Sequence, residues 1–241
     1  DVTVPTITLL GESAQSYEMG TAYVDAGATA ADNIDGDITS QIVLTISNSS
    51  GTTLSSVDIL TPDTYTLTYS VEDATGNAAV SVIRIVEITP DVTIPVITLV
   101  GESSITLERY TPYVDAGATA TDNIDGDITS SIVTINTVDT TKVGTYVITY
   151  NVSDGYGNPA AEVSRTVTII PIAISLSAPS DITVNATGHL TYVDIGSASV
   201  SAGEGEVTVS PSQMGPFESG MYEITWTAED SVGTTAVALQ K

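Results

Sequence analysis

The feature that most constrains this chain is an internal repeat, in which the stretch DNIDGDITS occurs at residues 32–40 and again at 122–130. The sequence around it also repeats, because TYTLTYSVEDATGN from residue 64 returns as TYVITYNVSDGYGN from residue 145. A third, looser copy carries MYEITWTAEDSVGT from residue 221. Since each copy of such a repeat is one structural unit, the sequence predicts three domains, with boundaries near Thr89 and Pro171: residues 1–89, 90–170 and 171–241.

Each repeat alternates apolar and polar residues with period two. In the second repeat Tyr146, Ile148 and Tyr150 alternate with Val147 and Thr149. This period indicates half-buried strands, and abundant Thr and Val with frequent turn residues favours a sandwich of about 70 to 90 residues per domain. The predicted fold class is therefore all-β, with three tandem sandwich domains in an elongated arrangement.

The motifs also carry a family resemblance. The first two repeats share PxITLxGE, YxDxGATAxDNxDGDIT and TYxxTYxVxDxxGN, and they resemble the bacterial Ig-like domain family first described in a pesticidal crystal protein. The third, with APSDITV and GPFESGMYEITWTAEDSVG, resembles a hyalin repeat. The resemblance implies immunoglobulin-like sandwiches strung in tandem on secreted or surface proteins, without catalysis. Because the third copy stops at Lys241 where the second continues to Ile170, we expect its C-terminal strand to be truncated and the chain to be part of a longer array.

The charge balance limits the partners. Five Lys and Arg residues face 30 Asp and Glu residues, which gives a formal net charge of -25. Such a field repels phosphate backbones and anionic lipids, so nucleic acid and membrane insertion are poor expectations, and a saline or calcium-containing medium suits the chain. With no cysteine, disulfides and thiolate chemistry are excluded. The sequence favours an extracellular, monomeric protein.

Residues that could carry catalysis are sparse. His189 is the one histidine, and it stands in a turn-like stretch without a second imidazole or a thiol to pair with it. Trp226 could be a platform for sugars, but it aligns with Tyr69 and Tyr150 and is expected in the core. The sequence therefore predicts that the chain is not an enzyme.

The acidic loops are the candidate metal site. In an immunoglobulin-like sandwich the loop after the YVDAGATAT strand and the loop after the TYVITYNVS strand lie at the same end as the entering linker. Oxygen ligands gathered in this way suit calcium. The expected ligands at the boundary of the first two repeats are Asp91, Asp122, Asp125, Asp127 and Asp154, with Asp32, Asp35, Asp37 and Asp73 as their equivalents in the first repeat.

Two interpretations of these acids stay open. Asp and Asn also cap turns through their own side chains, so the loops could be turns without a ligand. The third repeat has Ser201, Ala202, Glu204 and Glu206 in place of Asp122, Asn123, Asp125 and Asp127. Since it dispenses with the aspartates, a cation in the first two repeats is the simplest reason for keeping them.

For function, the sequence favours a non-catalytic spacer, stalk or adhesion segment of a larger secreted or cell-surface bacterial protein, stiffened by calcium at the first boundary. Its partners would be neighbouring domains and a surface glycan or protein ligand. The alternative is a carbohydrate-binding accessory region of a secreted hydrolase. Aromatic residues on an outer face would favour that alternative.

Overall fold

The computed structural model describes residues 2–241. Its regular elements are short strands and two 3-10 turns, η1 (Thr39–Gln41) and η2 (Thr129–Ser131). The all-β prediction is confirmed. Among residues 2–241, no helix has the length and apolar character needed to cross a membrane.

The described chain divides into two compact units. One combines residues up to 98 with residues 118–133 and 151–162, and the other combines residues 99–117, 134–150 and 163–241. This division passes through the second repeat, so the predicted domain boundaries near Thr89 and Pro171 stay predictions.

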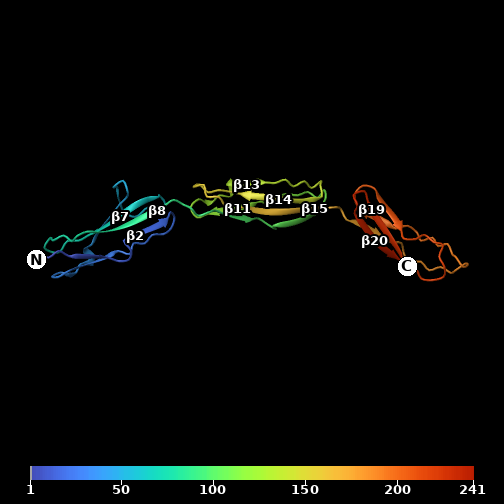
Figure 1. Ribbon diagram of the computed structural model, residues 1–241, viewed down its shortest axis with the longest axis horizontal. Coiled ribbons are helices and arrows are strands. Elements are labelled where there is room, and N and C mark those ends of the chain that lie inside the picture. Colours follow the sequence, from blue (N-terminus) through green and yellow to red (C-terminus); the bar gives the residue numbers. More distant parts are fainter. Residues whose placement is uncertain (1) are drawn as a thin grey trace. The chain divides into compact units, whose positions relative to one another are not determined.

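The first repeat forms two sheets of orders β1-β3-β4 and β2-β8-β7-β5-β6, in which β2 runs parallel to β8 (Figure 1). Asn48 and Gly51 close the hairpin between β5 and β6. The strands are β1 (Thr6–Leu9), β2 (Ala14–Glu18), β3 (Ala28–Asp32), β4 (Gly36–Asp37), β5 (Val43–Ser47), β6 (Thr53–Leu54), β7 (Asp63–Ser70) and β8 (Val82–Thr89).

The second and third repeats vary this plan. The second forms sheets of orders β9-β11-β12 and β10-β15-β14-β13, and the third forms sheets of orders β16-β17 and β18-β19-β20. The strands are β9 (Val96–Leu99), β10 (Ser104–Glu108), β11 (Ala118–Asp122), β12 (Gly126–Asp127), β13 (Val133–Ile135), β14 (Gly144–Asn151), β15 (Val163–Ile170), β16 (Ile174–Ser177), β17 (Ser199–Ala202), β18 (Val207–Pro211), β19 (Ile224–Asp230) and β20 (Thr235–Gln240).

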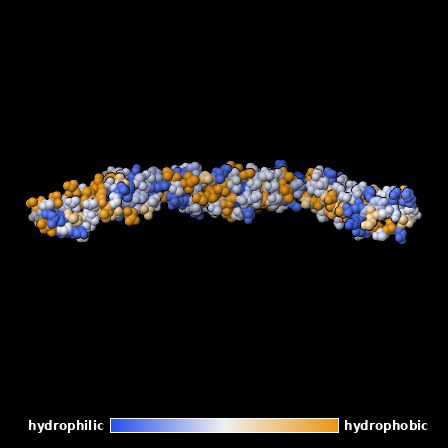
Figure 2. All heavy atoms as spheres, turned by 60° about the horizontal axis from the view of Figure 1, so that its bottom comes forward, coloured by the Kyte–Doolittle hydropathy of each residue, from blue (hydrophilic) through white to orange (hydrophobic). Residues whose placement is uncertain are grey.

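The cores follow the predicted period. On β7 the side chains of Tyr65, Leu67 and Tyr69 are buried, and on β14 those of Ile148 and Tyr150 are buried. The Tyr65 hydroxyl donates to the carbonyl oxygens of Asp58 and Thr61, a few residues upstream, as a corner tyrosine does. Apolar side chains also remain outside, and Figure 2 shows apolar and polar residues interspersed on the face it displays.

A buried arginine crosses the core of each of the first two repeats. Arg165 on β15 is fully buried, its Nη1 contacts the Asp115 carboxylate, and its Nε donates to the Glu102 carbonyl oxygen at 2.9 Å. The Tyr150 hydroxyl lies 2.7 Å from both oxygens of Asp115. Burial would raise the pKa of Asp115, but the hydrogen bonds from Tyr150 and Gly117 and the charge of Arg165 outweigh it and lower that pKa. The first repeat has the same network, made by Arg84, Asp25 and Tyr69.

The third repeat replaces this network with a neutral one. Gln240 pairs with Ile224 as Arg165 pairs with Ile148, so the two residues occupy the same position. The amide of Gln240 accepts from the Trp226 indole at 3.0 Å and donates to the carbonyl oxygens of Ser180 and Ile195, each at 3.0 Å. Trp226 is 5% exposed, which confirms the prediction that it belongs to the core.

Candidate metal centre

Three carboxylates converge beside the boundary of the first two repeats. Asp91 lies between β8 and β9, Asp122 ends β11, and Asp154 follows β14. One oxygen of each lies within 4.8 Å of the others. Thus three of the five acids that the sequence placed at this boundary come together, from segments far apart in the chain.

Asp91 is the most unusual of the three, because it is 3% exposed and its Oδ2 has no hydrogen-bond partner among the described residues. Its Oδ1 accepts from the Thr93 amide at 3.2 Å. Burial raises the pKa of the Asp91 carboxyl, and the neighbouring carboxyl groups of Glu18 and Asp122 raise it further. The ionised form of Asp91 is therefore unfavourable without a compensating positive charge.

Asp122 and Asp154 take part in turns as well as in the cluster. Asp122 Oδ2 accepts from the amides of Ile124 and Asp125, at 2.8 and 3.1 Å. Asp154 Oδ1 accepts from the Asn158 amide at 2.8 Å, and its Oδ2 accepts from the Asn158 side chain at 2.7 Å. Burial would raise the pKa of Asp154, but these hydrogen bonds lower it. Both carboxylates are thus held in place by their own loops.

Glu18, at the end of β2 in the first repeat, is a member of this region that the sequence analysis missed. Its Oε1 accepts from the Val92 and Thr93 amides and from the Thr93 hydroxyl, each at 2.8 Å. These hydrogen bonds, and one that the Asp91 carboxyl can donate when it is protonated, lower the pKa of Glu18 to about 2. An ionised carboxylate of the first repeat therefore lies beside the buried Asp91.

Asp125 and Asp127 occupy the other side of the loop. Asp125 Oδ2 accepts from the Gly155 amide, and Asp127 Oδ1 accepts from the Thr129 amide at 3.0 Å. Both side chains are exposed. The structure thus gives them hydrogen bonds within or between the loops and does not gather them with Asp91.

The equivalent end of the first repeat repeats these bonds. Asp35 accepts from the Ala74 amide at 2.8 Å, Asp37 from the Thr39 amide at 2.9 Å, and Asp73 from the Thr75 and Asn77 amides at 2.8 Å each. Asp32 Oδ1 has no partner within the part of the chain that the structure describes. The position that matches Asp91 is residue 1, which lies outside the described residues.

An apolar contact lies next to the carboxylates. Ile124, in the DNIDGD loop of the second repeat, packs against the core cluster of the first repeat. It faces Gly20, where an added Cβ would clash with Ile124 Cδ1. The matching Ile34 is 71% exposed. The loop therefore joins the two repeats through its apolar tip, beside the acids.

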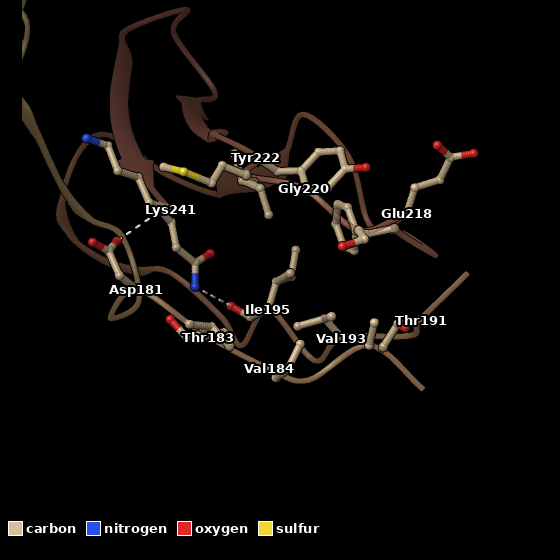
Figure 3. A pocket seen from close by; sticks show the side chains of 17 residues that line it. Asp181, Thr183, Val184, Thr191, Val193, Ile195, Glu218, Gly220, Tyr222 and Lys241 are labelled. Carbon is tan, nitrogen blue, oxygen red and sulfur yellow. Dashed lines mark hydrogen bonds between the residues drawn. The ribbon is translucent and has the colours of Figure 1, made fainter. Parts of the chain in front are cut away.

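A pocket of about 450 Å³ lies in the third repeat (Figure 3). Val193 and Ile195 lie on one side, opposite Tyr222. Tyr222 is 36% exposed, and its ring centroid lies 4.9 Å from that of Phe217. His189 is also exposed, and its Nε2 lies 3.6 Å from Glu218 Oε1. This confirms that His189 is a solvated loop residue.

Comparisons with known proteins found a matching family and several similar proteins. Residues 7–88 and 97–169 match the family described as bacterial surface protein, Ig-like domain. The hyalin of Lytechinus variegatus is 34% identical in an alignment of 189 residues that covers 71% of this chain and 35% of that protein. The pesticidal crystal protein Cry22Aa of Bacillus thuringiensis is 30% identical in an alignment of 144 residues that covers 57% of this chain and 18% of that protein. The immunoglobulin domains 1–5 of Sidekick-1 align with all of this chain and 58% of theirs, at 12% identity and a TM-score of 0.31.

Proposed function

We propose that this chain, which belongs to the Ig-like domain family of bacterial surface proteins, is a non-catalytic spacer, stalk or adhesion segment whose first boundary binds calcium. The family supports an immunoglobulin-like surface module. Because the chain spans 35% and 18% of the two relatives described above, the activity of a whole parent protein is a separate matter. The extracellular location belongs to the same proposal.

The observation that carries the calcium proposal is the buried, unpartnered Oδ2 of Asp91. A buried carboxylate without a compensating partner costs several kcal/mol, and like charges nearby add to that cost. Asp122 and Asp154 are such charges. A bound cation would offset the burial penalty of Asp91 and the repulsion among the three carboxylates.

Calcium fits this group of residues better than other common ions. The side chains offer oxygen only, which hard cations prefer, and calcium accepts an irregular shell that mixes carboxylates, carbonyls and water. Asp91, Asp122 and Asp154 would hold the ion, and Glu18 would supply further negative charge from the first repeat. A bound ion would neutralise the carboxylates and tie the linker to both loops of the second repeat.

The first repeat supports a second, weaker site in the same proposal. Of the four acids expected there, Asp32 and Asp73 stand at the positions of Asp122 and Asp154 and would be its ligands, and the unpartnered Oδ1 of Asp32 supports it. Asp35 and Asp37 make the same loop hydrogen bonds as Asp125 and Asp127 and would lie outside the ligand set. The third repeat is not proposed to bind calcium. In that repeat Asp230 stands at the position of Asp154, and its Oδ2 accepts from the Glu204 amide at 3.0 Å.

Thermal unfolding in calcium and in chelator tests the boundary site. At a calcium concentration ten times an ordinary extracellular dissociation constant, binding adds about 1.4 kcal/mol. For a domain of this size that raises the melting temperature by about 6 to 11 °C.

Asp154→Asn should abolish this calcium-dependent shift, whereas the matched control Asp230→Asn should retain it. Both substitutions keep the Oδ1 acceptor of a turn and disturb one hydrogen bond of Oδ2. Only Asp154 belongs to the cluster. Equal melting of the parent in calcium and in chelator would contradict the proposal.

The second candidate is carbohydrate binding, which the pocket of the third repeat favours. Its volume of about 450 Å³ is within the range of small-molecule sites, and Tyr222 offers a partly exposed ring against which a sugar could pack. Glycan-array binding that Tyr222→Ala abolishes would support this function. Absence of glycan binding by the parent chain would leave the spacer function alone.

A further inference from the structure

The second and third repeats meet through a different residue at the position of Met19. Met19 follows β2, and its amide donates to the Thr89 carbonyl oxygen at 3.0 Å. Arg109 follows β10, and its amide donates to the Ile170 carbonyl oxygen at 2.8 Å. The two positions are therefore equivalent. Met19 is 3% exposed within the core cluster of the first repeat, whereas the Arg109 side chain leaves its own core and contacts Glu204 of the third repeat.

Arg109 is held in position by its own repeat. Its Nε donates to the Thr141 carbonyl oxygen at 2.6 Å, and its guanidinium carbon lies 4.9 Å from the centroid of the Tyr110 ring. Tyr110 has a φ of 67°, which is strained for a residue other than glycine. Gly20, at the matching position of the first repeat, has a φ of 77°. The second repeat thus retains a glycine-like turn with an aromatic residue, whose ring lies against the guanidinium.

Glu204 is a buried carboxylate with a positive partner. It is 6% exposed, and its Oε2 accepts from Arg109 Nη1. Its Oε1 accepts from the Ile172 amide in the linker at 3.2 Å. At the first boundary the linker amides of Val92 and Thr93 are bound by Glu18 of the preceding repeat. The linker amides are therefore bound by a carboxylate in both cases, but only the second carboxylate pairs with an arginine.

The two boundaries also differ in which of two matching positions holds the small residue and which holds the large one. The first boundary sets Gly20 against Ile124. At the matching positions of the second boundary stand Tyr110 and Gly203. The two boundaries therefore differ both in charge and in which of the two facing positions holds the large residue.

We propose that Arg109 is a fixed cation that fastens the third repeat to the second through Glu204, so that this boundary needs no bound ion. A charge-assisted hydrogen bond is among the stronger polar contacts, and removal of Arg109 would leave the Glu204 charge buried and unpaired. This inference goes beyond the calcium proposal and does not depend on it.

Spin-label distances in the full chain test the inference. Because the sequence holds no cysteine, cysteines can be placed at the exposed Ser164 on β15 and Ser210 on β18. With chelator present, double electron–electron resonance should give one narrow distance distribution. Arg109→Met should broaden it. The matched control Lys142→Met also removes a positive charge of the second repeat, but its partner Asp139 lies in the same repeat, so the distribution should stay narrow.

Glu204→Gln provides the second arm, because it removes the charge of the partner and keeps its shape. It should broaden the distribution as much as Arg109→Met does, and the double variant should broaden it no further. Circular dichroism verifies that each variant is folded. If Arg109→Met unfolds the chain, the distance distribution of Glu204→Gln tests the inference instead. A parent distribution that is narrow only with calcium, or variants as narrow as the parent, would overturn the inference.

Discussion

Replacement of Arg165 by methionine should destabilise the second repeat more than any surface substitution. Methionine fills much of the same volume but cannot donate to the Glu102 carbonyl oxygen or neutralise Asp115. The Asp115 carboxylate would keep the hydrogen bonds of Tyr150, Tyr113 and Gly117 but lose its positive partner, in a site where its own side chain is 14% exposed. Breaking a buried ion pair by removing one partner costs about 3 to 5 kcal/mol.

Urea denaturation gives the measurement. With a slope of about 1 kcal/mol per M urea, the midpoint should fall by about 3 M or more, so the repeat approaches unfolding even without urea. Lys142→Met is the control, since it breaks the exposed pair with Asp139 and should cost less than about 1 kcal/mol.

The third repeat suggests a rescue. Tyr150→Trp, Arg165→Gln and Asp115→Asn together copy the neutral pair of Trp226 and Gln240 and leave no unpaired charge at residue 115, so they should recover part of the stability that Arg165→Met loses. If Arg165→Met lowers the midpoint no further than Lys142→Met does, the buried network has no stabilising role and the reasoning fails.

Three further predictions follow from the loops and the family. Hydrogen bonds from Asn77 and Thr75 overcome the effect of burial and lower the pKa of Asp73 from 3.8 to about 2. The stability that Asp73 contributes is therefore present above pH 3.8 and is lost as the pH falls toward 2. Unfolding measured over this pH range should show the loss in the parent chain and not in Asp73→Asn. Gly20→Ala should destabilise the chain more than Gly27→Ala in urea, because both have a φ of 77° but only the first adds a contact with Ile124; equal effects would show that the loop does not pack there. Screening on glycans, esters and peptides should give no turnover, and turnover that one acidic substitution abolishes would refute a non-catalytic role.

Much of the fold was predictable, because the period of two is visible in the sequence and each repeat shows it again. The same period places Arg165 in phase with Val167 and Ile169, so its inward direction could have been predicted. Its partner Asp115 could not, since only the packing of the two sheets brings together residues that lie 50 positions apart.

The candidate site divides in the same way. The topology of the sandwich brings Asp91, Asp122 and Asp154 to one end, as the sequence indicated. The direction of Asp125 depends on the turn conformation, which sends its carboxylate to the Gly155 amide. Glu18 was missed because its approach to the linker depends on how two repeats meet, which local sequence does not specify. Its place at a strand end beside the boundary was the available signal.

The most direct test of the account is an anomalous-scattering map of crystals grown with calcium, compared with crystals of Asp154→Asn. We expect a calcium peak between Asp91, Asp122 and Asp154, bound to the Asp91 Oδ2 that is otherwise without a partner, and no such peak in the variant. Water alone among these three carboxylates at a saturating calcium concentration would contradict it.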